Sequence, residues 1–151
     1  MKNLTLILIM MSLSQAAFTQ QITNPKSLFD PTPYGFSHVV VVPSGKGLVF
    51  IAGQGGEEDN PGTLDPDFRN QVHQVLSNIA TALETQELSL DDVVKVTTLV
   101  VDHNQDKLNI IVEEFNRYWP KKNFPANTLI PVPKLALEGM QVEIEAIAVS
   151  K

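Results

Sequence analysis

The pattern of apolar and polar residues predicts five strands and two helices in the order β-β-α-β-α-β-β. Short runs rich in Val, Ile and Leu, bounded by Gly, Pro or Asn, are typical of strands. These runs cover residues 38–42, 48–52, 93–101, 127–132 and 140–149. The turn sequence Pro-Ser-Gly-Lys-Gly separates the first two, so we expect them to pair as a hairpin.

Two further segments carry apolar residues at helical spacing. The first begins at Asp65-Pro66, since a capping side chain followed by Pro favours a helix start, and runs to about Thr85. The second begins after Asp102 or Asn104, and its apolar stripe consists of Leu108, Ile111, Val112 and Phe115, extending to Trp119.

This order predicts a single α+β domain with one uncovered face of the sheet. Two helices can cover only one face, yet the strands at 38–42, 48–52 and 93–101 are apolar on both faces. Three such strands would expose more apolar surface than soluble monomers usually tolerate. We therefore expect a second copy of the chain to cover the other face, which makes the protein a homo-oligomer.

Charge and composition narrow the possible partners and chemistry. The chain has 151 residues and a net charge of −6, which argues against nucleic acid and anionic membranes as partners. It contains no cysteine, so disulfides and thiolate chemistry are excluded. His38, His73 and His103 lack the spacing of metal ligands, and we expect no metal site.

The first residues resemble a secretory signal peptide. Lys2 precedes an apolar run, and small residues follow it before Gln20. We expect a signal peptide at residues 1–19, an extended leader at 20–37 and the folded domain at 38–151. The mature protein would then be exported, periplasmic or extracellular, without a membrane anchor. The alternative is a buried N-terminal helix.

The last strand carries two acids on one face. Glu143 and Glu145 are two residues apart, so both side chains point away from Val142, Ile144, Ala146 and Ala148. Two interpretations stay open. The acids either line a solvated or salt-bridged edge, or one of them moves protons through a water.

Two other features carry weaker signals. The glycines in "GQGG", residues 53–56, lack any phosphate-binding spacing and fit a simple exit from a strand. Tyr34 in the leader either closes a pocket or fastens the leader to the sheet.

Taken together, several stretches resemble the RidA/YjgF family of reactive-intermediate (imine and enamine) deaminases. They are "PYGFSHVV", "LVFIAGQGG", "FRNQVHQVLSNIATAL", "LDDVVKVTTLVVD" and "FPANTLIPVPKLALEGMQVEIEAIAV". The resemblance implies a chorismate-mutase-like fold, and a homotrimer with ligand clefts between subunits. It also implies hydrolysis of small imine or enamine acids without a cofactor.

The resemblance also suggests site residues. Glu143 takes the place of the glutamate that positions the attacking water, and Tyr34 that of the tyrosine that closes the cleft. Three positions depart from the family pattern. Asn127 replaces the arginine that grips the substrate carboxylate, Ala52 replaces a serine, and Leu129 replaces a cysteine.

The missing arginine bears most on function. Asn brings no charge, so a carboxylate bound in this cleft would lose about 2–4 kcal/mol. Lys134 is a nearby cation in the sequence that could compensate. We therefore expect a less anionic ligand, and two functions stay open: imine or enamine hydrolysis with Glu143 as the catalytic residue, or binding of a small ligand without turnover.

Overall fold

The computed structural model describes residues 21–58 and 62–150. The expected signal peptide at residues 1–19 lies outside these ranges. Neither helix in the described part is long and apolar enough to cross a membrane.

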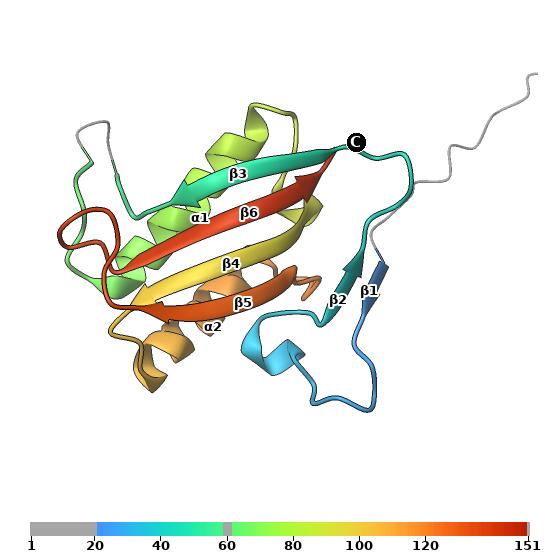
Figure 1. The fold of residues 1–151 in the computed structure, drawn as a ribbon, viewed down its shortest axis with the longest axis horizontal. Coiled ribbons are helices and arrows are strands. Elements are labelled where there is room, and N and C mark those ends of the chain that lie inside the picture. The colour runs from blue at the N-terminus through green and yellow to red at the C-terminus, as the bar shows by residue number, and fades with distance from the viewer. Residues whose placement is uncertain (1–20, 59–61, 151) are drawn as a thin grey trace, which may run out of the picture.

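A four-stranded sheet forms the centre of the domain (Figure 1). Its strand order is β3-β6-β4-β5, with β3 at Leu48–Gln54, β4 at Val93–Val101, β5 at Ala126–Val132 and β6 at Val142–Val149. β6 runs antiparallel to both β3 and β4, whereas β5 runs parallel to β4. The predicted α+β class is confirmed, and so are the strands near 48–52, 93–101, 127–132 and 140–149.

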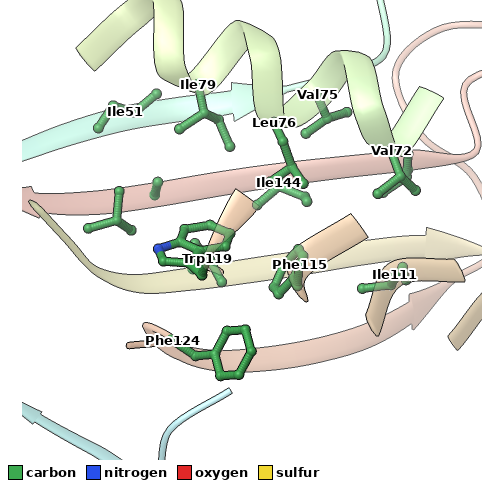
Figure 2. Packing of buried hydrophobic residues seen from close by; sticks show 14 of the residues in the cluster. Ile51, Val72, Val75, Leu76, Ile79, Ile111, Phe115, Trp119, Phe124 and Ile144 are labelled. Carbon is green, nitrogen blue, oxygen red and sulfur yellow. The ribbon is translucent and has the colours of Figure 1, made fainter. Parts of the chain in front are cut away.

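Helices α1 (Phe68–Glu84) and α2 (Gln105–Tyr118) lie on one face of this sheet (Figure 1). Their apolar stripes pack onto the buried side chains of β6 and β4 (Figure 2). Fully buried members of this core include Val72, Leu76, Ile79, Phe115, Trp119 and Ile144. The Trp119 indole N–H donates to the Leu90 carbonyl oxygen at 3.1 Å, so its single polar atom is satisfied.

Side-chain caps fix where both helices begin. The Asp67 carboxylate accepts from the Asn70 N–H, so α1 begins at Phe68 and the predicted start at Asp65-Pro66 is wrong. Asp65 instead accepts from the Asp67 N–H at 2.7 Å and shapes the preceding turn. Of the two predicted caps for α2, Asn104 is the one used.

The predicted hairpin between residues 38–42 and 48–52 is wrong. β2 (Val39–Val41) pairs with β1 (Gln21–Thr23), a strand inside the segment that we expected to be an extended leader. Just before β2, Ser37 bridges to Ala126 at the start of β5, and its N–H donates to the Pro125 carbonyl oxygen at 3.1 Å. β5 and β3 are opposite edges of the sheet, so a strand held beside β5 cannot pair with β3.

The face of the sheet away from the helices is open and partly apolar. Phe50 is 72% exposed, Leu48 49% and Ile130 41%. Leu48 and Phe50 lie on the β3 edge and Ile130 on the opposite, β5 edge, with Glu143 and Glu145 of β6 on the same face between them. The prediction of an apolar free face is therefore confirmed for β3, whereas β4 places Lys95 and Thr97 beside Leu99 on that face and β2 lies outside this sheet.

Candidate functional site

Three of the predicted site residues line one pocket. Tyr34, Asn127 and Leu129 surround a cavity of about 430 Å³ between the leader, α2 and the start of β5. Its other walls are Phe29, Phe36, Leu108 and Ile111. This volume falls in the range of small-molecule sites, roughly 300–1,000 Å³.

The leader reaches this pocket because several local contacts fold it. The Asp30 carboxylate accepts from the Thr32 N–H at 3.0 Å and opens the short 3₁₀ turn η1 (Thr32–Tyr34). These hydrogen bonds from Thr32 lower the pKa of Asp30 below its ordinary value. Gly35 follows with φ +72°, and a β-carbon there would approach the Phe115 β-carbon to 3.2 Å. Glycine therefore lets the leader lie directly on α2.

Aromatic contacts shape the leader wall of the pocket. The Phe29 ring meets Tyr34 edge-on at 5.9 Å between centroids, and Phe36 at 6.0 Å. His38 packs on both phenylalanines, and its Nε2 lies 2.9 Å from the Phe29 carbonyl oxygen. Tyr34 itself is about half exposed and sits at the mouth of the pocket. Tyr34 thus lines the pocket and also contacts the leader, and both roles expected for it stay predictions.

On the opposite wall, β5 presents Asn127 and Leu129 toward the helices. The Thr98 hydroxyl of β4 is fully buried and lies 3.1 Å from Asn127 Oδ1, to which it donates. Leu129 packs against the core. Lys134 is exposed beyond the far end of β5 and does not line the pocket.

Glu143 lies on the open face of the sheet. It stands opposite Leu99 of β4, while Glu145 stands opposite Thr97, so both acids share the face that we predicted. The alternate residues Val142, Ile144, Ala146 and Ala148 are buried, as predicted. Glu143 is partly buried and Glu145 is exposed.

The Glu143 carboxylate lies directly against the backbone of Gly53. A β-carbon at position 53 would stand only 2.0 Å from Glu143 Oε1 and 2.8 Å from Cδ. The pairing of β3 with β6 is irregular here, between Ile51 and Gln54. Ala52, the remaining predicted site residue, is exposed in the same irregular stretch. Gly53 is thus a site residue that our sequence interpretation treated only as part of a strand exit.

The predicted site residues therefore form two groups on opposite faces of one sheet. Asn127 stands opposite Val96, which stands opposite the buried Ala146, so Asn127 faces the helices. Leu99 is three residues beyond Val96 and faces the other way, together with Glu143. One protomer cannot bring Asn127 and Glu143 to the same small molecule.

The described residues contain no group of three or more His, Asp or Glu side chains that could hold a metal ion. His73, for example, contacts Glu114 and the Tyr118 hydroxyl between the two helices.

Comparison with known proteins identifies relatives over most of the chain. Residues 31–150 match the family described as Endoribonuclease L-PSP. A RutC family protein from Aquifex aeolicus is 36% identical over 132 residues, covering 86% of this chain and 98% of the relative. The human 2-iminobutanoate/2-iminopropanoate deaminase is 32% identical over 102 residues, covering 67% of this chain and 72% of that enzyme.

The fold agrees with these relatives. The crystal structure of a Rid family protein of unknown function, YyfB from Yersinia pestis, superposes with a TM-score of 0.80 at 33% identity, covering 86% of this chain and 98% of that one. The chain therefore belongs to the RidA/YjgF family, the family that its sequence motifs resemble.

Proposed function

We propose that this protein hydrolyses small imines and enamines at a cleft completed by a second protomer in a homotrimer. The observation that carries the proposal is the placement of Glu143 and Asn127 on opposite faces of the sheet. Covering the open face with a sister chain removes Phe50 and Leu48 from water and lets the Glu143 of one protomer face the pocket of the next.

Glu143 suits the role of the proton-transferring group. Its carboxylate is partly buried and packs against the Gly53 backbone, which it can approach closely because glycine has no side chain. In the reaction, Glu143 accepts a proton from water as the water oxygen attacks the C=N carbon, which gives a carbinolamine. Glu143 returns this proton to the nitrogen, and the new hydroxyl group then passes its own proton to the nitrogen through Glu143 as the C–N bond breaks, which releases a carbonyl compound and ammonia. An enamine first takes up a proton at carbon and releases one from nitrogen, which gives the imine.

Relatives support this reaction class. The human protein described above is named as a 2-iminobutanoate/2-iminopropanoate deaminase. The motifs shared with the family include the "VEIEAIAV" strand that carries Glu143.

The test follows the decay of imines made in place. Amino-acid oxidase supplies imino acids, and an amine oxidase supplies imines without a carboxylate; both use dioxygen as the oxidant. We expect the wild-type protein to speed decay of at least one imine, and Glu143→Gln to lower that rate about 100-fold. Glu145→Gln, on the same strand and face, is the matched control and should retain most activity. Decay at the buffer rate with every imine would refute the proposal.

A second candidate function is ligand binding without turnover. It is favoured by the absence of a cation among the described residues that line the pocket. Saturable binding of a carbonyl compound, together with no acceleration of imine decay, would establish this function instead.

A further inference from the structure

The walls of the pocket beside Asn127 are mostly aromatic and aliphatic. Three aromatic rings line its leader side, and three aliphatic side chains line the α2 and β5 side. Such walls favour a ligand with a ring or a branched alkyl group, because apolar burial and edge-to-face ring contacts both stabilise it. Polar atoms enter the cavity lining from only two side chains, Tyr34 and Asn127.

The Asn127 amide presents a donor to this cavity. Its Oδ1 already accepts from the buried Thr98 hydroxyl, and no described residue accepts from its Nδ2. A carbonyl oxygen or imine nitrogen is the natural partner of that N–H group. One such hydrogen bond in an otherwise apolar pocket fixes the orientation of a small ligand.

The neighbouring cations lie outside the lining of the pocket, and they include Lys122, whose charge acts on Asp30 of the leader. Lys107 donates to the Val101 carbonyl oxygen at 2.8 Å and lies over the Phe68 ring. Lys95 donates to the Val96 carbonyl oxygen and to Thr128, from the open face of the sheet. His38 stands behind Phe29 and Phe36, outside the lining. A ligand carboxylate in this pocket would therefore lose its hydration without gaining an ion pair.

We infer that the pocket binds a neutral compound in which an aromatic ring or branched alkyl group is attached to a C=N or C=O acceptor, and that Asn127 excludes carboxylates from it. The inference rests on the proposed function for the reaction that such a compound undergoes. The binding preference itself depends only on the lining of the pocket. It names a substrate class that differs from the imino acids in the name of the human relative.

A matched pair of stable ketones tests this preference. Acetophenone and benzoylformate share a phenyl ring and a ketone, but a carboxylate in the second replaces the methyl group of the first. We expect the wild-type protein to bind acetophenone at least tenfold more tightly in titration calorimetry. Acetophenone should also shift the NMR signals of Leu108, Ile111 and Leu129, which needs no variant.

Three variants sharpen the test. Asn127→Leu should weaken acetophenone binding about tenfold through loss of one hydrogen bond. Asn127→Arg should reverse the preference in favour of benzoylformate. The matched control, Gln86→Arg, adds the same charge on an exposed residue beyond α1 and should change neither affinity.

The outcomes separate this inference from the proposed function. Equal or tighter binding of benzoylformate by the wild-type protein, or acetophenone shifts confined to other parts of the molecule, would overturn the inference. Acetophenone preference without imine hydrolysis would uphold the ligand class and refute the reaction, and hydrolysis of imino acids in preference to neutral imines would do the reverse.

Discussion

The carboxylate of Glu143 occupies the space that a side chain at position 53 would fill, with Oε1 only 2.0 Å from where a β-carbon would stand. Gly53→Ala must therefore push the Glu143 carboxylate aside. We expect imine hydrolysis to fall about 100-fold, since a displacement near 1 Å costs that much in well-positioned sites. The rate of imine decay measures this effect.

The control for this variant is Gly47→Ala near the other end of β3. A β-carbon there would stand 3.1 Å from Ser150 Oγ and 3.7 Å from its β-carbon, and a small rotation of this side chain relieves the closer contact at the expense of one exposed hydrogen bond from the Gly47 N–H. Gly47→Ala should keep its activity. Full activity in Gly53→Ala would mean that the placement of Glu143 is not needed for turnover.

The open face of the sheet predicts how the protein assembles. Sedimentation equilibrium of the protein should give about three times the protomer mass. Phe50→Glu places a charge on this face and should yield protomers, whereas Thr81→Glu on the exposed side of α1 should leave the mass unchanged. A Phe50→Glu protein of unchanged mass would show that the face is covered in some other way.

Two adjacent glutamates, Glu113 and Glu114, should contribute differently to the free energy of unfolding, because only Glu114 is buried between the helices. The Glu114 side chain is fully buried and lies 3.2 Å from Arg69, 3.4 Å from His73 and 3.5 Å from Arg117. Glu113, 61% exposed, also contacts Arg69, at 2.6 Å.

Glu114→Ala should lower the free energy of unfolding by about 2–3 kcal/mol, because it removes buried charge-assisted hydrogen bonds while its partners can still reach water. Glu113→Ala should cost less than about 1 kcal/mol, as exposed pairs do. Urea unfolding at one fixed protein concentration compares them. Equal losses would show that the buried contacts of Glu114 contribute no more than the exposed pair.

The turn formed by Asp30 predicts that the stability of the pocket mouth depends on pH. Because Thr32 lowers the pKa of Asp30, the folded turn gains stability from the carboxylate above pH 3.8, and loses it as the pH falls through the lower, folded-state pKa. NMR titration of the Asp30 carboxyl should give a midpoint below 3.8. Thr32→Val removes the hydroxyl and should raise that midpoint. A wild-type midpoint at or above 3.8 would contradict the turn described for this segment.

Much of the fold could be predicted from periodicity because most elements have one buried face. The alternation in β6 places Glu143 and Glu145 together, and helical spacing identifies α1 and α2. The pairing of β2 could not be predicted, because it depends on the contact of Ser37 with Ala126, 89 residues away in the chain. The local turn sequence gave no sign of this distant anchor.

The candidate site, like the fold, could be predicted only in part from the sequence. The grouping of Tyr34, Asn127 and Leu129 could be expected from the family resemblance, and the structure places all three on one pocket. Their separation from Glu143 could not be predicted, because it requires knowing that β4 pairs with both β5 and β6. The contact between Glu143 and Gly53 likewise depends on the irregular pairing of β3.

Mixing two impaired variants, assayed at imine concentrations below the Michaelis constant, tests the central claim that each site combines residues of two protomers. Glu143→Gln and Asn127→Leu are made with different tags and coexpressed, and mixed trimers are purified through both tags. If Asn127 and Glu143 come from different protomers, each mixed trimer contains one site with both wild-type residues, and imine hydrolysis should recover to about a third of the wild-type rate per trimer. Mixed trimers that are no more active than the separate variants would contradict the account.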